Sequence, residues 1–349
     1  MLRLCVDSRD TLRDRRGIGR YVRELLRRFA AAEDVELTLV VDSSLPVLQT
    51  ARYRATLGSR RFRLVKRAGD ADVFWHPLNG TFCETSLPAV ATIHDVVPFA
   101  YPHPDPRKRR SQQHPFLRSA RAHAVITDSR FSAGEIARHL GVAEERISVI
   151  PLGVDEAFQP GSASPPAVLQ GRRYILAVTT LEPHKNLATL LAGFGRARFD
   201  ADVVLAVRGA LPSSADRVVS LEAMDDAALP ALYRGALFVA APGLYEGFGL
   251  PALEAMACGT PVLAARAGAL PEVCADAAAY VDAPESPDAW SAALGQLAGD
   301  ERRRIELRTL GIARAAPFTW DRTAELTLRV LRACARAGRD FAPATGTRN

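Results

Sequence analysis

Short runs of apolar residues alternate with amphipathic stretches along nearly the whole chain, a pattern typical of parallel α/β layers. In the first half, the runs that predict strands are residues 2–6, 37–41, 73–76, 89–93, 124–127 and 147–150. Residues 19–29 predict a helix, because their apolar side chains recur at helical spacing. A capping box from Ser132 to Glu135 predicts the start of another helix, which runs toward Leu140.

The second half repeats this alternation after a segment rich in proline, serine and glycine, which predicts a linker at residues 158–172. The predicted strands are residues 174–178, 203–207, 237–240, 261–265 and 278–281. The predicted helices are residues 187–195, 226–234, 251–258 and 287–297, followed by one long amphipathic helix at 320–337. Ser286 before Pro287 is a typical helix start, with serine as the N-cap.

These elements predict two doubly wound, Rossmann-like α/β domains that face each other across a cleft. The predicted boundaries are 1–157 for the first domain, 158–172 for the linker and 173–318 for the second domain. A C-terminal helix at 319–338 is expected to cross back to the first domain, with a tail at 339–349. Ligands of such sheets bind outside the carboxyl ends of the strands, so the strand ends are where a site is expected.

Charge is divided unevenly over the 349 residues. Residues 1–150 hold 25 Lys and Arg against 17 Asp and Glu, whereas residues 151–349 hold 20 against 22. Five widely spaced cysteines fit neither a zinc site nor a disulfide framework, which favours a reducing compartment. No signal peptide and no long apolar run is found, so a cytoplasmic protein, at most peripheral to a membrane, is expected.

The segment richest in candidate chemistry follows the predicted strand at 237–240 and has the sequence YEGFGLPALEAMACGTP, residues 245–261. Its glycines let backbone amides approach a ligand, and the helix that Pro251 begins offers free amides and a positive dipole end to a phosphate. Glu246 in the loop and Glu254 in the predicted first helical turn could accept hydrogen bonds from a vicinal diol. A tight strand–helix turn alone would explain Gly249 and Pro251, but it does not explain Glu246.

This segment resembles the donor-site signature of the retaining glycosyltransferases of family GT4, which have the two-domain GT-B fold. Further segments that resemble the family are LEPHKN (181–186), VIPLGVD (149–155), GALPE (268–272) and RGIGRY (16–21). The forms RGIGRY and TIHDVVPF resemble the branch rich in mannosyltransferases of surface polysaccharide synthesis. The resemblance therefore implies transfer of a hexose from a nucleotide sugar, with mannose from GDP-mannose as the first expectation.

Carried over by position, the resemblance implies that Glu254 holds the nucleotide ribose and that Glu246 lies against the donor sugar. The amides of Phe248, Gly249 and Leu250 would hold phosphate, sugar or both. Lys185 matches the phosphate-binding lysine of the family and would stabilise the diphosphate as it departs. The alternative for Lys185 is a solvated lysine at the start of a helix.

The sequence departs from the family pattern near this lysine. Related sequences place an arginine five residues before it or immediately before it, where this chain has Thr180 and His184. Arg208, at the end of the predicted strand 203–207, is the candidate for the missing cation.

In the first half, His94 follows the predicted strand 89–93, and the resemblance implies that it lies over the donor sugar. Gly17 and Gly19 are expected in the loop after the first strand, close to the diphosphate, although an ordinary glycine turn before a helix would also explain them. The resemblance implies a front-face reaction without an enzymic nucleophile, in which the departing phosphate takes the proton of the acceptor hydroxyl.

Two Asp-x-Asp patterns, at residues 70–72 and 200–202, directly precede predicted strands and therefore lie at the edge of each sheet opposite the expected site. No essential metal is expected.

The acceptor is expected to be a glycan or a lipid-linked molecule. Basic clusters at residues 107–110 and 52–67 are explained either as solvated surface or as a contact with anionic lipid. Nucleic acid is not expected, because no recognised binding module accompanies the charge. Alternatives are a transferase that uses a UDP-sugar on a small molecule or natural product, a catalytically weak glycosyltransferase-like binding subunit, and a nucleotide-sugar epimerase.

Overall fold

The computed structural model describes residues 1–9, 11–12, 17–42, 46–79, 85–209, 211, 217–221 and 224–340. The strands are β1 (Leu2–Asp7), β2 (Val35–Val40), β3 (Arg63–Val65), β4 (Val73–His76), β5 (Ala89–Thr92), β6 (Ala124–Thr127), β7 (Ile147–Val149), β8 (Arg173–Val178), β9 (Val203–Arg208), β10 (Val218–Ser220), β11 (Phe238–Ala241), β12 (Val262–Ala265) and β13 (Ala279–Val281). The α-helices are α1 (Gly17–Ala31), α2 (Pro46–Leu57), α3 (Val97–Ala100), α4 (Pro106–Ser119), α5 (Arg130–Leu140), α6 (Leu187–Arg196), α7 (Leu229–Gly235), α8 (Leu250–Ala257), α9 (Leu270–Cys274), α10 (Pro287–Gly299), α11 (Glu301–Ala315) and α12 (Trp320–Asp340). Short 3-10 helices lie at Glu144–Arg146, Ala167–Leu169, Pro183–Lys185, Asp226–Ala228 and Ala275–Ala277.

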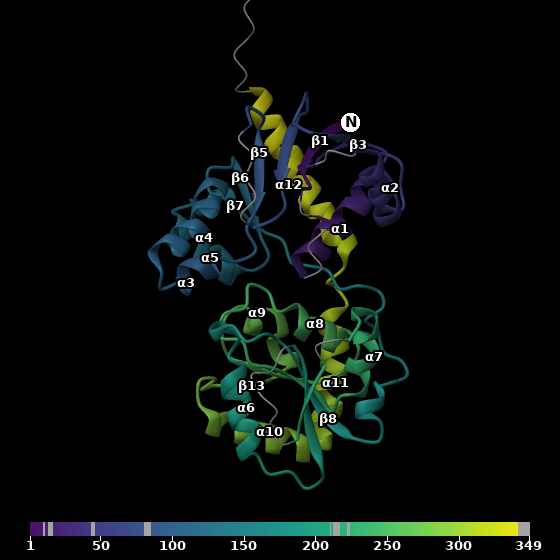
Figure 1. The fold of residues 1–349 in the computed structure, drawn as a ribbon, viewed down its shortest axis with the longest axis vertical. Coiled ribbons are helices and arrows are strands. Elements are labelled where there is room, and N and C mark those ends of the chain that lie inside the picture. The colour runs from purple at the N-terminus through teal and green to yellow at the C-terminus, as the bar shows by residue number, and fades with distance from the viewer. Residues whose placement is uncertain are drawn as a thin grey trace, which may run out of the picture. The chain divides into compact units, whose positions relative to one another are not determined.

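The chain forms two compact units (Figure 1). Unit 1 comprises Met1–Gly153 and Trp320–Asn349, and unit 2 comprises Val154–Thr319. The sequence places the first boundary after residue 157, and the contacts divide the chain after Gly153. Each unit contains one parallel β-sheet with helical crossovers, so the predicted α/β fold class with two doubly wound domains is confirmed.

The sheet of unit 1 has the strand order β3-β2-β1-β4-β5-β6-β7, and all its pairs are parallel. The direction of winding reverses between β1 and β4, which makes the carboxyl ends of these strands and their neighbours the place where ligands bind in such sheets. Every residue of β4 and β5 is buried. Burial on both faces explains why these strands appear in the sequence as short apolar runs rather than as alternating patterns.

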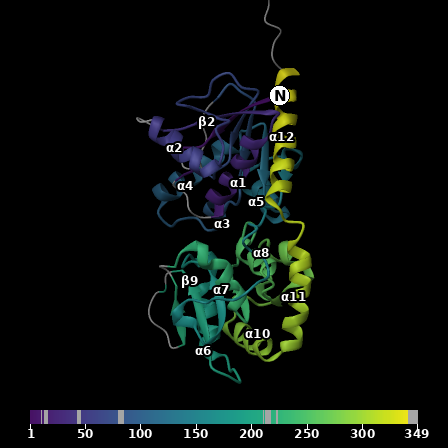
Figure 2. The ribbon, with the colours of Figure 1, turned by 90° about the vertical axis from the view of Figure 1, so that its right-hand side faces the viewer.

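Helix α12 packs on unit 1 against α1 and the strands β4, β5 and β6. Figure 2 shows it running along this unit. Leu331, Cys334 and Ala335 are buried on its inner face, as the amphipathic pattern of the last helix predicts. The expected return of the C-terminal helix to the first domain is therefore confirmed.

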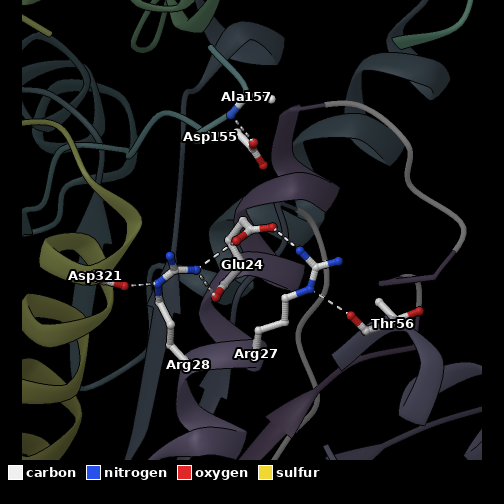
Figure 3. Close-up of polar contacts among 7 residues, drawn as sticks. All are labelled: Glu24, Arg27, Arg28, Thr56, Asp155, Ala157 and Asp321. Carbon is white, nitrogen blue, oxygen red and sulfur yellow. Dashed lines mark hydrogen bonds and ion pairs between the residues drawn. The ribbon is translucent and has the colours of Figure 1, made fainter. Parts of the chain in front are cut away.

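A carboxylate on α1 organises the contacts of α1 with its neighbours in unit 1 (Figure 3). Glu24 is 7% exposed and accepts hydrogen bonds from Arg27 Nη1 at 2.6 Å and from Arg28 Nη1 at 2.8 Å. Arg28 Nε also donates to Asp321 Oδ1 in the first turn of α12, and Arg27 Nε donates to the Thr56 carbonyl oxygen in α2. The two arginines therefore fix α12 and α2 against α1.

The sheet of unit 2 has the order β10-β9-β8-β11-β12-β13, again parallel throughout, and its winding reverses between β8 and β11. Helix α6 packs against α10, and α8 packs against α11. The reversal brings together the loops that follow β8 and β11, which hold the most informative motifs of the sequence.

Several predicted boundaries change in the structure. Helix α5 begins at Arg130 with Ser129 as its N-cap, whose Oγ accepts from the Ser132 amide at 3.0 Å. The capping box at Ser132 was therefore wrong by three residues. By contrast, Ser286 is the N-cap of α10, since its Oγ accepts from the Ala289 amide, as predicted.

The segment predicted as a linker, residues 158–172, lies within unit 2. Phe158 is buried there, and its ring packs edge-on against Tyr233 with the centroids 5.8 Å apart. Helix α12 extends to Asp340, and the rest of the predicted tail, residues 341–349, lies outside the described residues. Among the helices that the structure describes, none has the length and apolar character needed to cross a membrane.

Candidate active site

The loop between β11 and α8 in unit 2 turns sharply at Gly249. This residue is the N-cap of α8 with a φ of 99°, a conformation that favours glycine. An added Cβ would also lie 2.8 Å from Leu270 Cδ2. Phe248, Gly249 and Leu250 therefore lie at the amino end of α8, where the first backbone amides of a helix have no acceptor within the helix. This end of the helix favours an anionic group.

Glu246 in this loop forms an ion pair with Lys185. Lys185 Nζ lies 2.9 Å from Glu246 Oε2, and 27% and 20% of the two side chains are exposed. Lys185 ends the 3-10 helix Pro183–Lys185, which follows β8, and the amide of Leu244 donates to the carbonyl of His184 at 2.8 Å. The structure thus brings together the two residues that the motifs singled out, although they are 61 positions apart.

Close glycine contacts fix the position of Glu246. A Cβ on Gly243 would lie 2.4 Å from Glu246 Oε1, and one on Gly268 would lie 2.7 Å from the Glu246 amide nitrogen. Gly268 has a φ of 58°, and the next residue, Ala269, donates its amide to the Glu246 carbonyl at 3.0 Å. The GALPE segment therefore serves as a backbone support for the Glu246 loop.

Glu254 occupies a deeper position than the sequence predicts. It is the fifth residue of α8, and no acidic residue lies in the first turn, so its placement in that turn was wrong. Glu254 is 5% exposed, and its Oε2 accepts a hydrogen bond from the hydroxyl of Tyr233 on α7 at 3.0 Å. The hydrogen bond from Tyr233 helps to orient this buried carboxylate, which suits the recognition of a diol.

Arg208 ends β9, where it pairs in register with Val178 of β8, so it lies at the same edge of the sheet as the loop after β8. Its Nη2 donates to Asp226 Oδ1 at 3.0 Å. At the two positions without the family arginine, Thr180 lowers the pKa of Glu182 by a hydrogen bond to that carboxyl group, and His184 is buried. Arg208 is therefore at the predicted edge and has a carboxylate partner.

In unit 1, His94 lies just beyond the carboxyl end of β5 and is 4% exposed. Its Nδ1 is 2.7 Å from Asp128 Oδ2, and its Nε2 is 3.2 Å from the carbonyl oxygen of Pro77. The Tyr21 ring packs edge-on against the imidazole, with the centroids 4.8 Å apart. Both ring nitrogens of His94 are thus directed at protein oxygens.

These contacts favour the charged form of His94. The carbonyl of Pro77 can only accept, so Nε2 carries a proton, and the Asp128 carboxylate accepts from the other nitrogen. Burial by itself lowers the pKa of His94, but the charge and hydrogen bond of Asp128 outweigh this effect and raise it above the ordinary value. His94 and Asp128 therefore form a buried, hydrogen-bonded pair at the ends of β5 and β6.

Gly17 and Gly19 are the first and third residues of α1, so their predicted placement in the preceding loop was wrong. They lie in the first turn of the helix, which agrees with the alternative explanation of an ordinary glycine turn and helix start. Arg16 and residues 13–15 lie outside the described residues.

Comparison with known proteins decides the family. The family described as "Glycosyltransferase Family 4" matches residues 15–158, and "Glycosyl transferases group 1" matches residues 164–312. The O-antigen chain mannosyltransferase B of Escherichia coli is 31% identical, over 89% of this chain and 94% of the relative. The chain is a glycosyltransferase of family GT4.

Other relatives agree with this assignment. The MMP alpha-(1->4)-mannosyltransferase of Mycolicibacterium hassiacum is 35% identical to this glycosyltransferase, over 59% of this chain and 53% of the relative. Among solved structures, the sucrose-phosphate synthase of Thermosynechococcus elongatus is similar with a TM-score of 0.72 at 20% identity, covering 97% of this chain and 100% of that one. WaaG, a glycosyltransferase involved in lipopolysaccharide biosynthesis, is similar with a TM-score of 0.69 at 13% identity, covering 95% and 99%. The predicted GT-B fold is confirmed.

The partners of two candidate site residues, Asp128 beside His94 and Tyr233 beside Glu254, were not predicted from the sequence. Asp128 directly follows β6, so the strand-end rule that selected His94 would also have found it. Tyr233 lies within a helix and has no local signal, since only the packing of α7 on α8 brings its hydroxyl to Glu254.

The Asp-x-Asp pattern at 70–72 lies at the amino end of β4, as predicted. Both carboxylates pair with Arg3 of the glycosyltransferase, Asp70 Oδ2 with Nη1 and Asp72 Oδ1 with Nη2. The pattern therefore has a structural partner on the neighbouring strand β1.

Proposed function

We propose that this glycosyltransferase is a retaining, metal-independent enzyme that moves a hexose from a nucleotide sugar to a glycan or lipid-linked acceptor. Mannose from GDP-mannose is the first donor in this proposal. Two similar proteins are named mannosyltransferases, one of an O-antigen chain, which supports this choice. A UDP-sugar is the alternative, supported by a structural neighbour from Anabaena, HepE, that was solved in complex with UDP and glucose.

The observation that carries the proposal is the Lys185–Glu246 pair beside the amino end of α8. Both side chains are partly exposed, so the free energy needed to separate them is small. A ligand can therefore take the place of Glu246 beside Lys185 and the place of Lys185 beside Glu246. A diphosphate would take Lys185 and the amides of Phe248, Gly249 and Leu250. The hydroxyls of the sugar would then donate hydrogen bonds to Glu246, which is no longer paired with Lys185.

Further residues take part in donor binding in this proposal. Glu254 would hold the ribose, oriented by Tyr233, and Arg208 would add positive charge near the diphosphate. In unit 1, His94 would supply positive charge toward the donor sugar, and the first turn of α1 with Gly17 and Gly19 would offer amides to the diphosphate.

The reaction in this proposal breaks the bond between the anomeric carbon and the diphosphate oxygen while the acceptor oxygen bonds to the same face of that carbon. The proton of the acceptor hydroxyl passes to the departing phosphate, so no enzymic base or nucleophile is required. Lys185 and the amides at the start of α8 stabilise the charge that develops on the leaving group.

The acceptor side carries the second part of the proposal. The excess positive charge of residues 1–150 would bring unit 1 to an anionic membrane surface, where a lipid-linked acceptor would be found.

A panel of nucleotide sugars tests the enzymatic proposal by release of the nucleoside diphosphate, with GDP-mannose expected to react fastest. We expect Glu246→Gln to lower the rate by about 100-fold or more, because it removes a charge from the proposed sugar contact. Glu306→Gln is the matched control, since it also breaks a glutamate–cation pair, at Arg303 on α11, away from the site. The rate should be unchanged by a metal chelator, and the product should keep the anomeric configuration of the donor.

The outcomes separate the alternatives. Donor binding without turnover would favour a glycosyltransferase-like binding subunit. The proposed site would be contradicted if the protein neither bound nor turned over any donor and if Glu246→Gln did not change its thermal stability in the presence of donors.

A further inference from the structure

Asn186 lies between Lys185 and helix α6 in a backbone conformation that most residues avoid. Its φ is 57° and its ψ is 24°, in the left-handed region, which asparagine adopts more readily than most side chains do. Asparagine is a preferred N-cap, because its side-chain oxygen can accept from a free amide of the first helical turn. Asn186 is the N-cap of α6, yet within the described part of the chain its side chain makes no such hydrogen bond. Capping therefore does not explain this side chain.

The side-chain amide of Asn186 is directed instead at two other loops of unit 2. Its Nδ2 donates to the carbonyl oxygen of Pro242 at 3.2 Å and to that of Pro284 at 2.7 Å. Both partners can only accept, so the amide presents its nitrogen to them and uses its two hydrogens there. Pro242 directly follows β11, and Pro284 lies in the loop after β13. A residue that follows β8 is therefore bonded to the loops of two other strands at the same edge of the sheet.

Both acceptors of this amide belong to rigid parts of the chain. The ring of a proline fixes its φ, which restricts the backbone at Pro242 and Pro284. The carbonyl oxygen of Pro284 also accepts from the buried Trp290 of α10, whose Nε1 lies at 2.8 Å. Asn186 is 7% exposed, so breaking its hydrogen bonds would leave polar groups without a partner in a place that water does not reach easily. The amide therefore forms a fixed connection between the three loops.

The loop of Glu246 is bonded to the chain on both sides of Lys185. On the amino side, the carbonyl of His184 accepts from the amide of Leu244 at 2.8 Å. On the carboxyl side, Asn186 donates to the same loop at its first residue. The backbone under Lys185 is thus held to the backbone under Glu246 at two points, and the ion pair of 2.9 Å lies between them.

We propose that Asn186 is a positioning residue for sugar transfer, which holds Lys185 at a fixed distance from the loop of Glu246. A lysine side chain is a flexible stem that ends in a point charge, so the backbone beneath it decides where the ammonium group can lie. Asn186 fixes this backbone to Pro242. The next residue, Gly243, limits the space of the Glu246 carboxylate, because a Cβ there would lie 2.4 Å from Oε1. This role rests on the proposed function, since Lys185 and Glu246 are taken as contacts of the donor, whereas Asn186 acts through them.

Asn186→Gly tests this role with the least disturbance of the backbone. Glycine adopts the left-handed conformation without strain, so the substitution removes the amide and keeps the turn. We expect kcat/KM for release of nucleoside diphosphate, measured with the donor of the panel that reacts fastest, to fall about tenfold, because two hydrogen bonds that position Lys185 are lost. Thermal unfolding without donor shows that the variant is folded, and an unchanged kcat/KM in the folded variant would overturn the proposed role.

A double-mutant cycle with Lys185→Met separates positioning from a general loss of structure. If Asn186 acts through Lys185, Asn186→Gly should lower kcat/KM by less than about threefold once the ammonium group is absent. A tenfold loss both with and without the lysine would overturn the positioning role and leave the proposed function intact. No effect of Lys185→Met on its own would contradict the proposed function itself, so the two failures give different results.

Arg304→Met is the matched control. Arg304 Nη1 also donates to two backbone carbonyls, those of Leu297 and Ala298 near the end of α10, each at 2.6 Å. This end of α10 lies at the opposite edge of the sheet, since a Cβ on Gly299 would lie 3.9 Å from Oδ2 of Asp200, which precedes β9. The control should lose thermal stability and keep its kcat/KM. An equal fall in kcat/KM would mean that any loosening of unit 2 slows the reaction, and it would overturn the role of Asn186.

Discussion

Each unit holds a pair of one cation and one carboxylate at the carboxyl ends of its strands, but the two pairs differ in their access to solvent. In unit 2, Lys185 and Glu246 are 2.9 Å apart with 27% and 20% of their side chains exposed. In unit 1, His94 and Asp128 are 2.7 Å apart with only 5% and 3% exposed. These two pairs therefore place similar groups in a partly exposed position and in a buried one.

The difference in burial implies different uses. A partly exposed ion pair contributes about 0–1 kcal/mol, so a charged ligand can separate it. A buried pair cannot be opened without leaving a charge in a medium of low dielectric constant. We therefore expect the pair in unit 2 to bind ligand by exchange and the pair in unit 1 to supply a fixed, oriented charge, with Asp128 as the positioning residue of His94.

The largest expected effect follows from removing one member of the buried pair. Asp128→Asn keeps the shape but removes the carboxyl group that raises the pKa of His94, and it should lower the free energy of unfolding by about 3 kcal/mol near pH 6. Glu246→Gln should change it by less than about 1 kcal/mol. Chemical denaturation of both variants measures the comparison directly, and equal losses would show that the two pairs do not differ.

The effect of Asp128→Asn should depend on pH in one direction. The folded-state pKa of His94 is raised above its unfolded value, so the stabilisation by Asp128 is complete below the unfolded value of about 6.5 and is lost as pH rises through the folded value. The difference between wild type and Asp128→Asn should therefore shrink above about pH 6.5. A difference that grows with rising pH would contradict the charged form of His94.

Whether the residues of these pairs could be predicted from the sequence depends on where each residue lies along the chain. Lys185, Glu246 and His94 follow predicted strands, and the reversal of winding in parallel sheets places such residues at one edge. The partners of the buried groups were not predicted, because Tyr233 reaches Glu254 only through the packing of two helices. The sequence thus predicted both members of the partly exposed pair, Lys185 and Glu246, but only His94 of the buried pair.

The elements of the fold also differ in how well the sequence predicted them. Central strands such as β4 and β5 are predicted within one residue of their ends, since continuous apolar runs report burial on both faces. The edge strands β3 and β10 have only three residues each and carry no such run, so they were missed. Helix α2 was missed as well.

A smaller effect is expected from disturbing the support of the exposed pair. Gly268→Ala introduces a Cβ that would lie 2.7 Å from the Glu246 amide, in addition to the strain of a positive φ. We expect a loss of about 2 kcal/mol in the free energy of unfolding, together with slower sugar transfer as the Glu246 loop moves.

Gly141→Ala is the matched control for this substitution. Gly141 has a similar φ of 63°, but an added Cβ there would meet no atom within 4 Å. It should cost only about 1 kcal/mol, the conformational part, and leave the transfer rate unchanged. If both alanine variants retain equal activity, the contact of Gly268 with Glu246 has no role in the site.

The smallest expected effect concerns Glu254, which is the buried and oriented carboxylate of unit 2 and thus its nearest counterpart to Asp128. Tyr233→Phe removes its hydroxyl donor and should lower the free energy of unfolding by about 1 kcal/mol. If Glu254 holds the ribose, the same substitution should weaken donor binding by about fivefold, since the carboxylate then loses a hydrogen bond that orients it. Tyr174→Phe removes a hydroxyl that donates to the Leu232 carbonyl of the same helix α7 at 2.6 Å, so it should cost similar stability without changing donor affinity. Donor titrations of the two variants therefore decide whether unit 2 also relies on a fixed buried charge, because an equal effect of both on affinity would restrict Tyr233 to packing.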